Sequence, residues 1–309
     1  MTTLFIDWNP SIEVFTLGSL TVRWYALCWM AGLAAAYLIV RRLYQAEGID
    51  PVRTAKGKWE PTGKFDPLVF YAFIGVVLGA RLGHCLFYEP DYFLSSGKHI
   101  IEMLLPIRFA PDSWSWKMVG YSGLASHGGA AGLFIALLLY VRRTGVGMWR
   151  VLDMIALVAP LTSFFIRIGN LMNSEIIGKP TDMPWGFVFH TSDALVDGQL
   201  AARHPSQLYE ALAYLLIFFI GWRLYRGAAT SAKDNEAAPT RRSIGSGFYF
   251  GFCLTTIFLF RFFIEFLKEV QGGTDDGSTV LDMGQMLSLP FVLVGLFCMW
   301  RLPGIRNNK

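Results

Sequence analysis

Long apolar segments recur along the whole chain and limit its possible folds more than any other feature. A helix needs about 20 mostly apolar residues to cross a membrane. Seven segments are long enough: 19–40, 67–88, 122–141, 150–170, 206–224, 245–268 and 281–300. Of the 309 residues, 16% are charged, whereas soluble domains carry roughly 25%. The sequence therefore predicts an all-α, polytopic bundle of about seven transmembrane helices, one integral membrane domain over 1–309, with the lipid bilayer and no nucleic acid as its partner.

The basic residues of the loops predict an orientation, because Lys and Arg are enriched in loops on the cytoplasmic side. One set of connections holds 17 of them: 41–66, 142–150, 223–243 and 301–309. The alternate set holds 5: 1–18, 89–121, 171–205 and 269–280. We therefore expect an outside N-terminus, a cytoplasmic C-terminus and small outer regions at 89–121 and 171–205. That arrangement agrees with an odd number of spans.

Four arginines fall inside the predicted spans: Arg23, Arg81, Arg167 and Arg261. An arginine at the bilayer centre costs about 2.5–3.5 kcal/mol, so each needs a partner or contact with water. Counted along the helices, all four lie in the outer half of the membrane. Three further polar residues lie there too: Tyr25, His127 and Glu210. These positions predict one shared polar cavity, although Arg23 could instead reach the interface and Arg81 could be a structural ion-pair partner.

Two acidic residues lie close to possible cationic partners. Glu210 enters a span at the end of RHPSQLYE, and an arginine is the partner that would neutralise it at the lowest cost. Glu265 follows Arg261 by four residues on the same helical face, so these two could form an ordinary intrahelical ion pair.

Glycines accompany the histidine in HGGAAG at 127–132. They leave space beside the imidazole for a ligand or for a neighbouring helix, and His127 could also be a plain hydrogen-bond partner between helices. A second set, at every fourth position from Gly75 to Gly83, predicts close approach of two helix backbones.

The cysteines indicate neither a metal site nor a disulfide. Each lies in an apolar run and none has CxxC spacing: Cys28, Cys85, Cys253 and Cys298. We expect no cofactor and no metal.

Four motifs resemble those of the bacterial prolipoprotein diacylglyceryl transferases. In chain order they are HGGAAG at 127–132, RIGNLMNSEIIG at 167–178, RHPSQLYEA at 203–211 and FRFFIEFLKE at 260–269. The resemblance spans nearly the whole chain. It implies a seven-span enzyme of the inner membrane with its active site toward the periplasmic leaflet. Such an enzyme moves the diacylglyceryl group of phosphatidylglycerol onto the lipobox cysteine of a prolipoprotein, which forms a thioether and releases glycerol phosphate.

The resemblance also implies roles for individual residues. His127, Arg167 and Arg261 correspond to the family's essential histidine and its two principal arginines, and we expect them to be catalytic. We expect substrate-binding roles for a further set: Tyr25, Arg81, Asn170, Glu175, Gly178, Glu210 and Glu265. The chain departs from the family at Ile257, where a tyrosine is common, and at 268–271, where KEVQ replaces R-E-P-D. Segments 51–64 and 106–120 are longer than the compact family pattern.

These residue types suit the displacement of a phosphate ester by a thiol. A free cysteine has a pKa of about 8.5, so a base must favour the thiolate, and His127 is the candidate. Guanidinium groups bind phosphate through two parallel hydrogen bonds, so Arg167 and Arg261 would hold the headgroup and stabilise the leaving charge. Asn170 and Glu175 could orient Arg167 or bind the headgroup glycerol.

Two other function classes remain open. The segment at 120–123 matches the GxSG of an intramembrane serine protease with Ser122 as nucleophile, but the later spans contain no histidine to activate it. A secondary transporter would also gather polar residues in one cavity. Transporter sites usually lie near the midplane between repeats, and no repeat is visible here.

Overall fold

The computed structural model describes residues 5–18, 20–50, 63–110, 113–119, 123–191, 194–196, 198–235, 241–269 and 281–300. The chain divides into two compact units. The first unit is Met1–Leu43 with Trp149–Lys309, and the second unit is Tyr44–Met148. Both are mostly helical.

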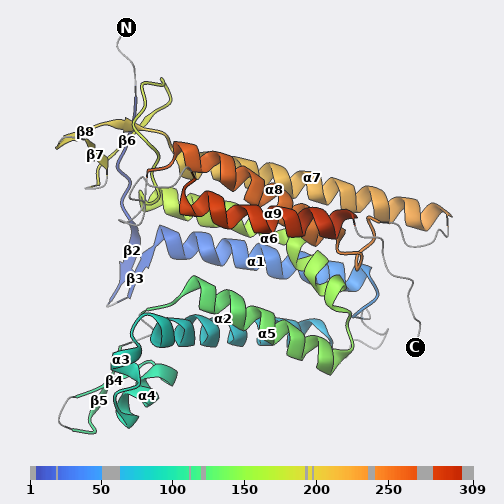
Figure 1. Cartoon of the computed structure of the whole chain (residues 1–309), viewed down its shortest axis with the longest axis horizontal. Helices are drawn as coiled ribbons and strands as arrows, with labels where there is room; N and C mark the ends of the chain where they lie inside the picture. Colours follow the sequence, from blue (N-terminus) through green and yellow to red (C-terminus); the bar gives the residue numbers. More distant parts are fainter. Residues whose placement is uncertain are drawn as a thin grey trace. The chain divides into compact units, whose positions relative to one another are not determined.

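Long helices make up most of the first unit (Figure 1). They are α1 (Trp24–Ala46), α6 (Met148–Met172), α7 (Ser206–Asn235), α8 (Phe248–Ile264) and α9 (Met283–Trp300), and a single 3-10 turn, η2 (Glu265–Leu267), continues α8. Helices α8 and α9 approach closely at two glycines, since a Cβ atom on Gly295 would lie 2.8 Å from the carbonyl oxygen of Gly251.

Short strands lie at one end of these helices (Figure 1). Strand β6 (Phe187–Phe189) pairs in parallel with β1 (Ile6–Trp8) and antiparallel with β9 (Ala202–Arg203). Two hairpins accompany this sheet: β2 (Glu13–Leu17) with β3 (Leu20–Arg23), and β7 (Leu195–Val196) with β8 (Gln199–Leu200). A small apolar core joins the sheet to the loop after α6: Leu171, Ile177, Phe187, Phe189 and Ala194.

The second unit is built on α2 (Phe65–Phe87) and α5 (Ser126–Thr144). A Cβ atom on Gly79 would lie 2.7 Å from Cα of Gly132, and one on Gly83 would lie 2.7 Å from Cα of Gly128. The predicted close approach of helix backbones is therefore confirmed, and the glycines after His127 serve that contact. Between α2 and α5 the chain forms α3 (Pro90–Phe93), α4 (Gly97–Leu104) and a hairpin of β4 (Ile107–Phe109) and β5 (Trp116–Met118).

Among the described residues, five helices are long and apolar enough to cross a membrane: Trp24–Ala46, Phe65–Phe87, Met148–Met172, Ser206–Ser231 and Phe248–Leu267. The apolar helix Gly284–Trp300 is shorter. The prediction of a mostly helical, multi-span membrane protein is thus confirmed at this level.

The start of the first span was predicted wrongly. The sequence placed it at residue 19, but residues 20–23 form a strand and α1 begins at Trp24. Alternating β-branched residues favour the hairpin, and Gly18 supports its turn with a φ of 61°. Arg23 therefore ends a strand and is exposed. Short strands in 1–23, 89–121 and 171–205 were not expected from an all-α class.

Candidate active site

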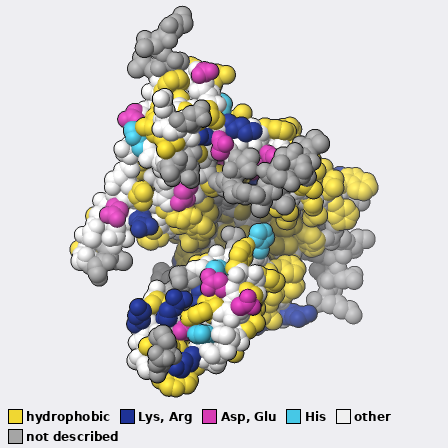
Figure 2. All heavy atoms as spheres, turned by 60° about the vertical axis from the view of Figure 1, so that its left-hand side comes forward, with side chains coloured by type: hydrophobic (Ala, Val, Ile, Leu, Met, Phe, Trp, Pro, Cys, Tyr) yellow, Lys and Arg dark blue, Asp and Glu magenta, His cyan; other side chains and the backbone are white. Residues whose placement is uncertain are grey.

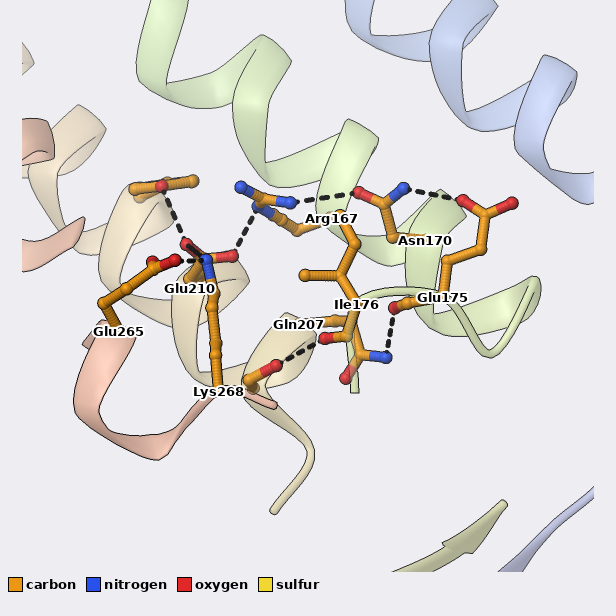
Figure 3. A network of polar contacts seen from close by, with 10 residues as sticks. Arg167, Asn170, Glu175, Ile176, Gln207, Glu210, Glu265 and Lys268 are labelled. Carbon is orange, nitrogen blue, oxygen red and sulfur yellow. Dashed lines mark hydrogen bonds and ion pairs between the residues drawn. The ribbon is translucent and has the colours of Figure 1, made fainter. Parts of the chain in front are cut away.

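A fully buried carboxylate, Glu210, lies at the centre of the candidate site near the start of α7. Its two oxygens face two cations (Figure 3). Oε2 lies 2.6 Å from Nε of Arg167, on α6, and Oε1 lies 2.9 Å from Nζ of Lys268. The prediction that an arginine neutralises Glu210 is confirmed, and a lysine joins it.

Lys268 extends these contacts to a fourth charge. It is only 7% exposed, and its Nζ lies 3.3 Å from Oε2 of Glu265. Arg167, Glu210, Lys268 and Glu265 thus form a continuous charge chain with two positive and two negative members, and its net charge is zero (Figure 3).

The sequence allowed an ion pair between Arg261 and Glu265, but Glu265 pairs with Lys268 instead. Helix α8 ends at Ile264, and the following 3-10 turn brings Glu265 next to Lys268, three residues on. Sequence reasoning missed the part that Lys268 plays. Its position at the predicted end of a span, close after Glu265, was the available signal.

Arg261 is a nearby cation that is not part of the charge chain. In the part of the chain that the structure describes, no carboxylate forms an ion pair with it. It acts electrostatically on the Tyr214 hydroxyl, as Arg167 and Glu210 also do. The charge chain is neutral, so the charge of Arg261 is not balanced by it.

A second set of contacts holds the far side of the Arg167 guanidinium. Its NH1 donates to Oδ1 of Asn170 at 3.3 Å, and Asn170 Nδ2 donates to Glu175 Oε2 at 3.1 Å. Asn173 Nδ2 donates to the other oxygen of Glu175 at 2.9 Å. These contacts fit the expectation that Asn170 and Glu175 orient Arg167.

The loop after α6 has an unusual backbone. Ser174 and Ile176 have φ values of 53° and 58°, and a β-branched residue in this left-handed region is rare and strained. Two side chains from the start of α7 hold the loop (Figure 3). Ser206 Oγ donates to the carbonyl of Ile176 at 2.6 Å, and Gln207 Nε2 donates to that of Glu175 at 2.5 Å. The sequence analysis did not predict this contact.

Three motif segments meet at Gly178. A Cβ atom there would lie 2.7 Å from Cβ of His204 and 2.8 Å from the carbonyl oxygen of Leu267. The Gly178 amide donates to the His204 carbonyl at 2.9 Å, and the Lys179 amide donates to the Leu267 carbonyl at 2.8 Å. Only glycine fits at this junction. The His204 imidazole accordingly lies in a partly buried setting, which lowers its pKa.

Arg203 fastens the same junction from its other side. Its NH1 lies 2.5 Å from Oε2 of Glu269 and donates to the Gly178 carbonyl at 3.2 Å, and its Nε donates to the Ala194 carbonyl at 3.0 Å. This arginine is 3% exposed. The Arg203 guanidinium is thus occupied by hydrogen bonds and an ion pair within the protein, which indicates a structural role.

Tyr25, on α1, lies against α6 beside the site. A Cβ atom on Gly169 would approach Cδ2 of Tyr25 to 2.9 Å. The small size of this glycine lets the tyrosine ring pack closely against α6.

The remaining predicted site residues belong to the second unit. His127 lies in the first turn of α5, where its side chain is exposed, and no polar contact to it is recorded within the described ranges. Arg81 is buried, donates to the Glu102 carbonyl at 3.0 Å, and stands over the Phe93 ring at 4.9 Å. Its contacts connect α2 to α3 and α4.

Over the residues that the structure covers, no group of three or more His, Cys, Asp or Glu could hold a metal ion. None of the four cysteines forms a disulfide. Ser122 of the GxSG segment lies outside the described residues.

Comparison with known proteins gives a consistent result. A family model described as prolipoprotein diacylglyceryl transferase matches residues 13–301. A Bacteroides fragilis protein named phosphatidylglycerol–prolipoprotein diacylglyceryl transferase is 46% identical over 297 residues, which cover 96% of this chain and 95% of that protein. Proteins of the same name from Porphyromonas gingivalis and Tolumonas auensis are 39% and 38% identical, with at least 94% of each chain covered. The protease and transporter alternatives receive no support from these similarities.

Proposed function

Because the chain belongs to the prolipoprotein diacylglyceryl transferase family, we propose that it transfers the diacylglyceryl group of phosphatidylglycerol to the lipobox cysteine of a prolipoprotein. The cysteine sulfur forms a thioether bond to the glycerol carbon. The bond from that carbon to the phosphate oxygen breaks, and glycerol phosphate leaves. The thiol proton goes to a base, and the reaction needs no oxidant or reductant.

The unmatched charge of Arg261 is the observation that carries this proposal. The charge chain is neutral, whereas Arg261 has no anionic partner within the described ranges and acts on the same Tyr214 hydroxyl as Arg167. A phosphodiester headgroup would supply the missing negative charge. Two guanidinium groups suit that ligand, because their planar donors match phosphate oxygens.

Arg167 is well placed to stabilise the leaving group. Glu210 holds its Nε and Asn170 holds its NH1, so the guanidinium is fixed before the substrate binds. Groups that are oriented in advance toward developing charge supply a large part of catalysis. We assign the same task to Arg261. Glu210, Lys268, Glu265, Asn170 and Glu175 act through these arginines as positioning residues.

We assign to His127 the role of the base that accepts the proton of the lipobox thiol. Its imidazole is exposed at the start of α5 and free of recorded polar contacts within the described ranges, so it is available to accept the thiol proton. We propose that Tyr25, Arg81 and Gly178 contribute to substrate binding indirectly, because their packing shapes the surfaces around them.

The assignment is tested with purified protein, phosphatidylglycerol and a lipobox peptide, by measuring thioether formation and glycerol phosphate release. His127→Gln, Arg167→Ala and Arg261→Ala should each lose at least 100-fold in rate, a typical loss for one acid–base or charge-stabilising group. Arg142→Ala, an exposed arginine at the end of α5, is the control and should keep its rate. Near-normal transfer by folded His127→Gln and Arg167→Ala variants would overturn the assignment.

The topology is part of the same proposal. We infer that the whole chain forms one domain of seven spans in the bacterial inner membrane, with the N-terminus outside, the C-terminus in the cytoplasm and the site toward the periplasmic leaflet. The support is the distribution of Lys and Arg among the loops. Cysteines introduced at positions 95 and 235 should react with an impermeant thiol reagent from the periplasmic and cytoplasmic side respectively. The same sidedness for both would contradict seven spans.

A further inference from the structure

In the segment between α2 and α5, a charged side chain is buried and several apolar side chains are exposed. In α4, Glu102 is 2% exposed, whereas Ile100, Leu104 and the following Leu105 are 43%, 49% and 49% exposed. A helix in water would show the opposite pattern. The apolar side chains therefore face a surrounding that is not water, and α4 follows closely on α2, a candidate span.

The buried carboxylate of Glu102 is occupied inside this segment. It accepts hydrogen bonds from the Tyr92 hydroxyl at 2.8 Å and from the Phe109 amide at 2.6 Å. Glu89 lies 3.3 Å from the His84 imidazole. Both carboxylates thus have polar partners of their own.

Like charges stand directly opposite one another on the neighbouring hairpin. Strands β4 and β5 pair Arg108 with Lys117, an arrangement that destabilises an isolated hairpin. Within the described ranges neither side chain has an ion pair; Arg108 stands over the Tyr92 ring at 5.4 Å. Asp112, between the two strands in the sequence, lies outside the described residues. Glu89 and Glu102 line a smaller pocket with Arg108, but both are engaged with other groups, so Arg108 and Lys117 have room for an anionic ligand.

A pocket of about 660 Å³ lies at these two cations. Its lining includes Lys98 as a third cation, together with Tyr92, His99 and Trp116. Lys98 stands over the Trp114 ring at 5.2 Å. Figure 2 shows Lys and Arg side chains gathered low in the view, on this part of the molecule. The size suits a small headgroup, and exposed tryptophans are typical of a membrane interface.

We propose that the pocket between α4 and the β4–β5 hairpin binds the phosphate of an anionic phospholipid in the adjoining leaflet, as an accessory site built from other residues than those around Glu210. Arg108 and Lys117 hold the phosphate from two sides, and Lys98 adds to their charge. The exposed side chains of α4 lie among the acyl chains. A phosphate free in solution would supply the same charge, but it would leave that apolar face exposed to water.

The test measures contact between this pocket and lipids of defined charge, without an acceptor peptide. The full chain, with a fluorescent label at Met118→Cys, is placed in phosphatidylcholine bilayers that contain brominated phosphatidylserine or brominated phosphatidylcholine as quencher. The unsubstituted chain is labelled in parallel to measure reaction at native cysteines. Brominated phosphatidylserine should quench at an about fivefold lower mole fraction, the factor that one cation contributes near an anionic surface.

Matched variants locate the effect. Arg108→Gln with Lys117→Gln should remove the preference, whereas Arg108→Lys with Lys117→Arg should keep it. Arg142→Gln with Arg143→Gln, an equal charge change at the far end of α5, should also keep it. In the unsubstituted pocket the preference should fall as salt is raised, which remains a test if the double glutamine variant does not fold.

Three results would overturn the proposal. They are equal quenching by both lipids, a preference that the double glutamine variant retains, and loss of the preference when inorganic phosphate is added at constant ionic strength. The last result would identify a site for free phosphate. None of these measurements depends on transfer activity, so failure here and failure of the proposed reaction are separate outcomes.

Discussion

Glu210 offers the sharpest test of the charge chain, since its carboxylate separates two cations. In the wild type, the Glu210 carboxylate lies 2.6 Å from Nε of Arg167 and 2.9 Å from Nζ of Lys268. Glu210→Gln keeps the shape of the side chain but removes its negative charge, so Arg167 and Lys268 then face one another without an anion between them. Two unit charges roughly 5 Å apart repel by about 3 kcal/mol at an effective dielectric constant near 20. Breaking a buried ion pair typically costs about 3–5 kcal/mol. We therefore expect the free energy of unfolding to fall by about 3 kcal/mol.

A second substitution should restore most of that loss. In Glu210→Gln with Lys268→Met, the repulsion is gone because Arg167 stands alone. Glu265→Gln, at the end of the charge chain, removes a carboxylate that pairs with Lys268 alone, so it should cost about 1 kcal/mol. Asp182→Asn, an exposed residue of the same unit, is the control.

Reversible denaturation in mixed micelles measures these free energies. A loss below about 1 kcal/mol in Glu210→Gln, or a double variant no more stable than the single one, would refute the electrostatic account. Transfer should also fall in Glu210→Gln at temperatures where the variant is folded, because Arg167 loses one of its two supports.

Four further variants test other parts of the structure. Gly178→Ala should lose about 1–3 kcal/mol of stability through overpacking against His204 and Leu267, and wild-type stability would contradict the junction. Ile176→Gly relieves a strained backbone with a φ of 58°, whereas Ile177→Gly empties a buried position. The free energy of unfolding of Ile176→Gly should therefore be higher than that of Ile177→Gly by at least about 2 kcal/mol. Equal losses in the two variants would argue against strain at Ile176. Gly79→Val should separate α2 from α5, seen as faster protease cleavage of the second unit, and unchanged cleavage would contradict close packing. Burial lowers the pKa of His204, so just below about pH 6.5 the unfolded state binds more protons than the folded state. The free energy of unfolding should therefore fall as the pH is lowered through that window. His204→Gln should reduce this dependence on pH, and an unchanged dependence would exclude His204 as its source.

The sequence was sufficient for features that depend on burial and charge alone. Apolar length located the long helices to within a few residues, apart from the start of the first and the end of α7, which runs to Asn235. A glutamate at membrane depth correctly predicted an arginine partner, Arg167. Four-residue glycine spacing predicted the contact between α2 and α5. These rules are local or involve one strong interaction.

Features that depend on where a helix ends were harder to predict. Helical periodicity placed Glu265 beside Arg261, but the 3-10 turn after Ile264 changed the spacing and gave Glu265 to Lys268. The left-handed backbone at Ile176 carries no sequence signal, because a β-branched residue argues against it. Ser206 and Gln207 make the conformation possible from another motif. Such contacts arise only once distant segments have come together.

The charge chain also bears on how the protein is made. Its members are synthesised in the order Arg167, Glu210, Glu265 and Lys268, and the first and last are 101 residues apart. Arg167 enters the membrane without its counter-ion, Glu210 then balances it, and Lys268 arrives with the last turn after α8. We expect nascent chains that stop before α8 to keep an incomplete ion network and to be recognised by membrane quality-control proteases. We therefore expect the network to be completed only late in biogenesis, when α8 and the turn after it have been made.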